Sequence, residues 1–289
     1  MTTPTLDELI ASMPKLASYA GVLHELDEVL NDMNSTLTEI CEVIEKDPAM
    51  AAKLLKLGNT CFFGFTRRVE TVFDTISLIG IQQVRDLIAA STVMRMFEGI
   101  SSEHVNMESF WQHSLACGVA ARILAIVGQL PKPEKHFTAG LLHDIGKLVL
   151  YSRLPEQTGA VFQLCKGKKL LLREAEKTIL GYDHAETGAA LLQAWNYPFN
   201  LIHAVRFHHL ALAAGAFQLD ACIIHLADHL VCAMELGRAG ERFIPPLNMK
   251  VWERLGLATD SLQSVMDSID EQFAAVEEVF LSKPGADGT

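Results

Sequence analysis

The sequence predicts an all-α fold, a helical bundle made of two packed subdomains, on three observations. Nearly every apolar segment repeats at i, i+3, i+4 and i+7, which is the spacing of one helix face. Alternating apolar and polar residues with hairpin turns do not recur, and the one segment that could be extended, RRVETVF, makes no sheet alone. The polar stretch at residues 98–109, which contains His104, separates a first part with a single histidine, His24, from a later part that holds nine.

Start and stop signals delimit the helices of the first part. The segment ELDEVLNDMN is predicted to end near residues 34–35, and Ser35 is predicted to cap the helix TLTEICEVIEK. Asp47 followed by Pro48 predicts a helix start, with Asp at the N-cap and Pro at the first helical position. That helix should stop at residues 58–59, and TVFDTISLIG and IQQVRDLIAASTVMRMF continue the helical pattern.

In the later part, Asn106 is predicted to cap the helix that contains FWQHSLACGVAARILA, and Asp183 with Glu186 fits a capping box. The stretch GQLPKPEKH is predicted to be a loop, so His136, like His104, should be solvated. The predicted organisation is an N-terminal helical subdomain at 1–105, a metal-binding helical subdomain at 106–282 and a disordered tail at 283–289.

Composition excludes several classes of function. With 49% hydrophobic and 20% charged residues among 289, the chain is globular rather than disordered. A net charge of −11 argues against nucleic-acid and anionic-membrane binding, since both need a basic face. The six cysteines form no C-x-x-C pair, the N-terminus lacks a signal peptide, and no apolar run is expected to span a membrane. We therefore expect a cytoplasmic protein with reduced thiols.

The stretch GLLHDIGK places His143 and Asp144 side by side in an apolar run, where burial is costly unless both are paired. Further imidazoles and one carboxylate occur on or beside other apolar helices. The full set of candidate metal ligands is His113, His143, Asp144, His184, His208, His209 and Asp228. Helical bundles build divalent-metal sites from such inward-facing ligands. A metal ion would offset the desolvation of the buried pair.

Each candidate also has an ordinary interpretation. His113 could be a core histidine bonded to a backbone carbonyl, His184 could be incidental in the first turn of its helix, and Asp228 could cap or pair locally. His208 and His209 point about 100° apart on a helix, so one of them is expected in the site rather than both. Together, however, these interpretations require five coincidences on five apolar helices, and the metal site is the better prediction.

The order of these residues resembles the HD superfamily of metal-dependent phosphohydrolases, and LLHDIGK closely matches its signature. The resemblance implies one or two divalent ions and a lysine, here Lys147, that contacts the substrate phosphate. It also implies that Asp144 bridges the ions. By the same resemblance the first ion is held by His113, His143 and Asp228, and the second by His184 with His208 or His209.

Two longer segments narrow the resemblance to the HDOD (HD-related output domain) family. IEKDPAMAAKLLKLGNTCFFG with VETVFDTISLIGIQQVRDL is similar to its N-terminal half, and LGYDHAETGAALLQAWNYPFNLIHAVRFHH to its later half, together covering about residues 5–240. HDOD proteins are regulatory output modules, many with a degraded metal site. Related phosphodiesterases carry a Gly-Tyr-Pro motif after the His pair and an acidic residue where Leu210 stands. This chain has neither the Gly-Tyr-Pro motif nor the acidic residue, which argues against cyclic di-GMP hydrolysis. Ser109 stands where some of those enzymes have a carboxylate for a third metal ion, which argues against a third ion.

Two functions therefore compete. The preferred prediction is a bacterial-type signal-transduction module that binds one or two ions, iron or manganese rather than magnesium, and acts through a protein partner. The alternative is a phosphohydrolase or phosphodiesterase acting on a nucleotide or cyclic dinucleotide, with Asp144 and Lys147 in catalysis. An open cleft into which Lys147 points would favour the enzyme, and a plugged site would favour the module. In the module, the Lys147 ammonium is expected to be solvated and so of no consequence for stability.

Overall fold

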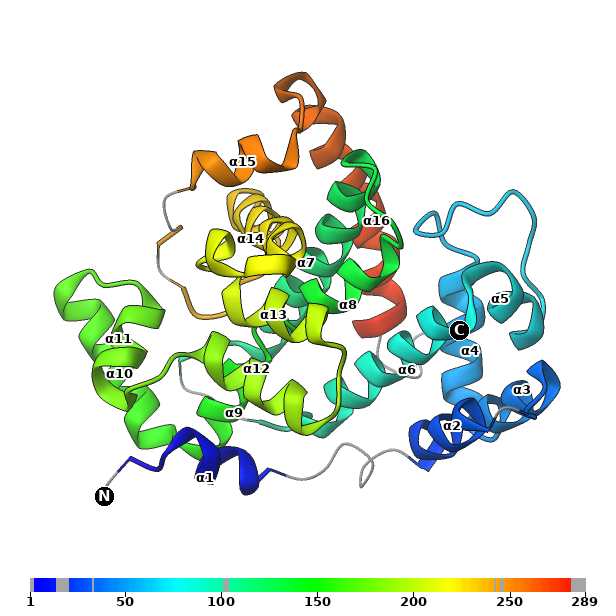
Figure 1. Cartoon of the computed structure of the whole chain (residues 1–289), viewed down its shortest axis with the longest axis horizontal. Helices are drawn as coiled ribbons and strands as arrows, with labels where there is room; N and C mark the ends of the chain where they lie inside the picture. Colours follow the sequence, from blue (N-terminus) through cyan, green and yellow to red (C-terminus); the bar gives the residue numbers. More distant parts are fainter. Residues whose placement is uncertain are drawn as a thin grey trace, which may run out of the picture. The chain divides into compact units, whose positions relative to one another are not determined.

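The computed structural model describes residues 3–13, 21–32, 34–100, 104–241, 243–244 and 247–281, and within these ranges the regular structure is helical with no strand. The all-α prediction is confirmed (Figure 1). The chain divides into two compact units. The larger unit comprises Met1–Pro14 with Gly99–Ile269, and the smaller unit comprises Lys15–Glu98 with Asp270–Thr289.

The described residues of the smaller unit form five helices and the end of a sixth. These are α2 (Gly21–Asn31), α3 (Leu37–Glu45), α4 (Pro48–Gly58), α5 (Val72–Ile79), α6 (Ile81–Met96) and the later part of α16 (Leu262–Leu281). Asp47 caps α4 by accepting a hydrogen bond from Met50 N, as predicted. The prediction that Ser35 caps α3 is wrong. Thr36 is the N-cap, because Glu39 stands three residues after it and closes a capping box.

The larger unit surrounds one long buried helix. Its elements are α1 (Leu6–Ala11), α7 (Met107–Val127), α8 (Glu134–Leu142), α9 (Ile145–Arg153), α10 (Pro155–Lys168), α11 (Leu172–Leu180), α12 (His184–Ala194), α13 (Phe199–Phe207), α14 (Gln218–Ala233), α15 (Met249–Leu255) and the start of α16. Asn106 caps α7, as predicted, and every residue from Phe110 to Ala125 except Gln112 is buried. The core of this unit is therefore built around α7, against which α8 and α14 pack.

The division by contacts differs from the predicted one at both ends of the chain. The first 14 residues belong with the larger unit, which resumes at Gly99, and the residues from Asp270 onward belong with the smaller unit. The prediction followed chain order, whereas the units are defined by which segments touch. The predicted tail at 283–289 lies outside the described residues.

Two helical stretches in the described part of the chain, Met107–Val127 and Gly215–Ala233, are long and apolar enough to cross a membrane by length and composition. The expectation that no apolar run reaches that length is therefore wrong. However, 78% and 61% of their apolar windows are buried inside the protein, which is typical of core helices. No disulfide joins any of the six cysteines, in line with the expectation of thiols.

Candidate metal centre

The His143–Asp144 dipeptide lies where α8 ends and α9 begins. His143 is the C-cap of α8, and Asp144 precedes the first residue of α9. Two glycines of the same stretch let these helices approach their neighbours. A Cβ atom at Gly140 would lie 2.4 Å from the carbonyl oxygen of Cys117 in α7, and one at Gly146 would lie 1.9 Å from that of His184 in α12. The glycines of GLLHDIGK thus bring the dipeptide between two other ligand-bearing helices.

We expect Gly146→Ala to destabilise the larger unit strongly. The added methyl would meet backbone atoms, His184 O at 1.9 Å and Gly188 N at 2.6 Å, which cannot move aside as a flexible side chain would. Overpacking of this kind costs about 1–3 kcal/mol, occasionally more. Thermal unfolding followed by circular dichroism should show a melting temperature about 5 °C or more below the wild type. Gly167→Ala, where an added Cβ has no neighbour within 4 Å, is the control, and equal effects would contradict this account.

One half of the candidate centre gathers around Asp144 Oδ2. His143 Nε2 lies 3.3 Å and His113 Nε2 lies 3.7 Å from this oxygen. Asp228 Oδ1, on α14, lies 3.4 Å from His113 Nε2 and 4.0 Å from His143 Nε2. These four residues come from α7, the α8–α9 junction and α14, so three separate segments of the chain converge here.

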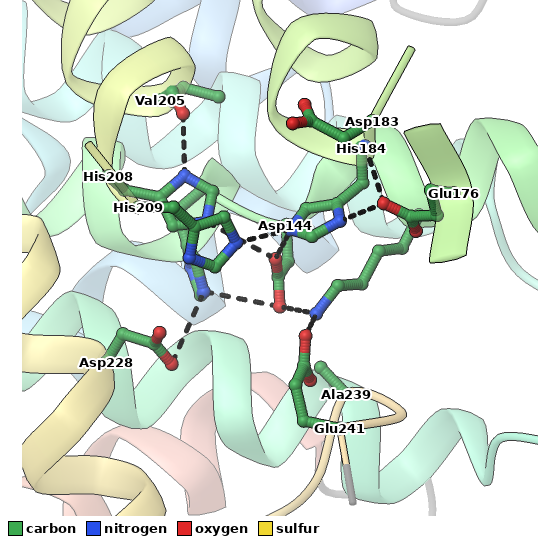
Figure 2. Close-up of polar contacts among 12 residues, drawn as sticks. Asp144, Glu176, Asp183, His184, Val205, His208, His209, Asp228, Ala239 and Glu241 are labelled. Atoms are coloured by element: carbon green, nitrogen blue, oxygen red, sulfur yellow. Dashed lines mark hydrogen bonds and ion pairs between the residues drawn. The ribbon is translucent and has the colours of Figure 1, made fainter. Parts of the chain in front are cut away.

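The other half gathers around Asp144 Oδ1. His184 Nε2 lies 3.5 Å and His208 Nε2 lies 4.0 Å from this oxygen. His209 Nε2 is 2.8 Å from His184 Nε2, so the three imidazoles surround one space (Figure 2). The two oxygens of one carboxylate thus face two ligand clusters, which is the arrangement of a bridging ligand.

Both members of the His pair face this space, contrary to the expectation that only one would. The expectation assumed that both lie on a helix and so point about 100° apart. The helix α13 ends at Phe207, His208 is its C-cap, and His209 follows in a turn. The two side chains nevertheless converge, with the ring centroids of His208 and His209 only 3.9 Å apart.

Backbone carbonyls and one buried carboxylate orient the imidazoles. The Nδ1–H groups of His143 and His208 donate to the carbonyl oxygens of Gly140 and Val205, each at 2.6 Å. His184 Nδ1 donates to Glu176 Oε2 at 2.6 Å. These hydrogen bonds leave each Nε2 directed into the centre, as metal-ligating histidines require.

The acids of the centre are ionised, and two of its imidazoles, those of His208 and His209, are neutral. Burial alone would raise the pKa of Asp144, but His143 and Lys147 hold it well below its ordinary value. Burial and the neighbouring His143 keep the pKa of His208 well below its ordinary value, and burial and His208 do the same for His209. Carboxylates that are ionised and imidazoles that are neutral are the protonation states that bind metal.

Several buried polar atoms of the centre have no hydrogen-bond partner among the described residues: His143 Nε2, Asp144 Oδ1 and His208 Nε2. Leaving such groups unsatisfied costs free energy, so an absent partner is implied. Although burial lowers the pKa of His143, the attraction of Asp144 and Asp228 raises it to about 9. The two carboxylates thus favour a positive charge beside His143 Nε2. The residues fit a divalent ion, which would supply that charge.

The Lys147 ammonium is enclosed rather than solvated, which corrects the expectation for a module. Its side chain is 1% exposed, and Nζ donates to Asp144 Oδ2 at 2.7 Å. Nζ also pairs with Glu241, so it contacts two carboxylates. Burial would lower the pKa of Lys147, but Asp144 and Glu241 raise it well above its ordinary value, so the ammonium stays charged.

The segment that carries Glu241 is closely packed against the centre. Gly237, at φ +78°, approaches α7 so tightly that a Cβ there would lie 2.3 Å from His113 N. Arg238 N donates to Ser109 O at 3.0 Å, and Tyr151 OH donates to Ala239 O at 3.1 Å. A cavity of about 230 Å³ remains between this segment and the centre, lined by residues that include His113, Cys232, Glu241 and Phe243.

All seven predicted ligands therefore meet at one place, and two further carboxylates of the site escaped sequence reasoning. Glu176 is buried beside His184, and its spacing of four residues from both Leu172 and Leu180 puts it on the buried face of α11. That spacing was a usable signal. The sequence gives no such signal for Glu241, because this residue lies in a polar stretch with no helical periodicity.

His136 is not a solvated loop residue, so that expectation is wrong. It lies in α8, is 1% exposed, and its Nε2 is 3.0 Å from Asp220 Oδ1. Lys135 Nζ contacts the same oxygen at 2.8 Å. This pair of a buried His136 and a half-buried Asp220 does not belong to the ligand clusters and offers a control for experiments on the centre.

Comparison with known proteins supports the assignment of the fold. A family model described as the HDOD domain matches residues 16–211. Among solved structures, an HDOD domain protein of unknown function from Geobacter sulfurreducens has a TM-score of 0.76 at 22% identity, covering 96% of this chain and 97% of that one. A candidate phosphohydrolase from Shewanella amazonensis SB2B has a TM-score of 0.75 at 23% identity, covering 96% and 98%. At such identities these structures show a shared fold alone.

Two further proteins are similar to this chain. A candidate metal-dependent phosphohydrolase, also from Shewanella amazonensis SB2B, has a TM-score of 0.66 at 18% identity and covers 97% of this chain and 93% of that one. An uncharacterised protein of Treponema pallidum (strain Nichols) is 26% identical over 206 residues, which are 71% of this chain. The match spans only 39% of the length of that curated relative.

Proposed function

Because this chain belongs to the HDOD family, we propose that it is a regulatory output module that binds one or two divalent ions and acts through a partner protein. The ions would join the ligand-bearing segments of the larger unit. The nitrogen-rich donor set favours iron or manganese over magnesium, which prefers oxygen ligands. The composition favours a cytoplasmic location, where the cysteines would stay reduced.

The observation that carries this proposal is the enclosure of Lys147. A hydrolase would need this cation to meet the charge that develops on phosphorus. Here the ammonium is already neutralised by Asp144 and Glu241 and is 1% exposed. Glu241 therefore occupies the position of an anionic ligand, which supports a centre that holds structure rather than one that binds a phosphate ester.

A second function, hydrolysis of a phosphate ester, is favoured by one specific observation. The two ligand clusters share Asp144, so two ions could be held side by side. Divalent ions in such a site lower the pKa of water and stabilise the charge of a phosphoryl group. The residues of this chain would contribute Asp144 as a shared ligand and Lys147 as a cation, once Glu241 had withdrawn.

Assays of the metal-loaded protein distinguish the two functions. We expect the wild type to hydrolyse cyclic di-GMP, GTP and bis(p-nitrophenyl) phosphate no faster than Asp144→Asn, in which the shared ligand is lost. Glu241→Gln is measured alongside, because a gain of turnover there would mean that the centre is competent once Lys147 is released. Metal-dependent turnover of the wild type above the Asp144→Asn background would establish the enzyme instead.

A further inference from the structure

The smaller unit has a groove that the metal centre does not use. It lies between the end of α4 and the loop that follows, from Asn59 to Glu70, and its volume is about 990 Å³. The groove is open to solvent along the loop, where residues 66–68 and Glu70 are exposed. Its openness suits an extended chain segment better than an enclosed small molecule.

The loop that forms the groove is held in one conformation by its own side chains. The Asn59 amide donates to Val69 O and accepts from Val69 N, both at 2.8 Å, and so pairs the two ends of the loop. Phe62 and Val69 are each 2% exposed and anchor it in the core. The half-buried rings of Phe63 and Phe65 stack with centroids 5.7 Å apart. The groove is thus a preformed feature, which lowers the entropic cost of binding.

The lining of the groove is basic, although the chain as a whole carries a net charge of −11. Arg67 and Arg68 are both exposed, and neither has an ion-pair or hydrogen-bond partner within the described residues. Lys56 also lines the groove, but its Nζ is 2.9 Å from Glu278 Oε1. Glu70 is the acidic member of the lining. The two guanidinium groups therefore carry the unmatched charge.

We propose that this groove docks an acidic peptide segment of a partner protein. The inference rests on the proposed function, in which the module acts through such a partner. Guanidinium groups bind carboxylates through paired hydrogen bonds, and arginine and aromatic residues are enriched in protein interfaces. Arg67 and Arg68 supply the guanidinium groups, and Phe65, which lines the groove, supplies the aromatic ring. An acidic peptide segment that also carries an aromatic or aliphatic side chain could bind the two arginines and pack on Phe65.

The charge of the rest of the protein favours a peptide over a nucleic acid. Each phosphate of a polynucleotide needs a neutralising cation, and binding of useful affinity takes several such contacts. Two unmatched arginines cannot supply them, and the net charge of −11 repels a polynucleotide more strongly than a short peptide with a few carboxylates. A peptide needs only a few carboxylates at the arginines.

The test is a selection from a phage-displayed random dodecapeptide library on the wild-type protein and on the double variant Arg67→Glu, Arg68→Glu. A second variant, Lys166→Glu with Lys168→Glu, makes the same change of charge at exposed residues of α10 and serves as the control. We expect the wild type to enrich sequences rich in Asp and Glu. Fluorescence anisotropy of the enriched peptides should show affinity at least ten-fold weaker for the arginine variant and unchanged for the lysine variant.

Three outcomes would overturn the inference: no enrichment of acidic sequences, equal binding to both charge variants, or tighter binding of a single-stranded oligonucleotide than of any selected peptide, with that binding lost in the arginine variant. Melting temperatures establish that the variants are folded, as exposed positions should allow. A negative result in the peptide selection is distinct from failure of the proposed function. That function is tested by comparing the metal content and turnover of the wild type with those of Asp144→Asn.

Discussion

The variant Asp144→Asn should purify with less than about a tenth of the metal carried by the wild-type protein. Oδ2 of this residue lies 3.3 Å from His143 Nε2, and Oδ1 lies 3.5 Å from His184 Nε2, so both ligand clusters depend on it. An amide offers one neutral oxygen in place of two charged ones. Inductively coupled plasma mass spectrometry of protein prepared without a chelator measures the loss.

Two further variants make this result specific. Asp220→Asn alters a carboxylate that also lies 3.0 Å from a buried histidine, His136, but outside the ligand clusters, and should leave the metal content unchanged. Asp228→Asn should remove only the ion near His113 and His143, since Asp228 lies in that cluster alone. Full stoichiometry in Asp144→Asn would mean that the bridging ligand has been misplaced.

The second large effect is a loss of stability in Lys147→Ala, measured on metal-free protein. The substitution leaves the carboxylates of Asp144 and Glu241 without their buried cation. Breaking a buried ion pair from one side costs about 3–5 kcal/mol. For a domain of this size we expect a melting temperature about 10 °C lower by differential scanning fluorimetry. Adding a divalent metal should recover part of the loss, because the ion neutralises Asp144.

A second lysine, Lys177, shows how much of the expected effect depends on the burial of Lys147 rather than on its charge. Lys177 also contacts two carboxylates, those of Asp183 and Glu186, but its side chain is 47% exposed. Exposed pairs contribute about 0–1 kcal/mol, so Lys177→Ala should change stability little. Combining Lys147→Met with Glu241→Gln should be less destabilising than Lys147→Met alone. If Lys147→Ala and Lys177→Ala have equal effects, the enclosure of Lys147 has no energetic consequence and the account is wrong.

The parts of the fold that sequence could predict depend on neighbouring residues. Asp47–Pro48 starts α4, Asn106 starts α7, and Asp183 with Glu186 starts α12, because each cap acts on amides within three residues of itself. The misplaced cap of α3 was an error of the same local kind, since Glu39 completes a box with Thr36 and not with Ser35.

The residues of the candidate ligand set could also be predicted from the sequence. Imidazoles and carboxylates recur on apolar helices, where burial without a partner is costly, so their number and order predicted a shared site. The packing around α7 then decides which atoms meet. It places the two oxygens of Asp144 toward different clusters, and it brings both His208 and His209, which follow α13, into the site.

By itself, then, the sequence determined the helical class, the starts of α4, α7 and α12 and the seven candidate ligands that meet at one place, because these follow from side-chain chemistry and from periodicity within a few residues. Only the tertiary structure decided the environment of Lys147. Its partner Glu241 lies 94 residues further along the chain, in a segment without periodicity. The close packing of Gly237 on α7 brings that segment to the centre. No local rule relates residues so far apart, since their contact depends on how the intervening helices pack.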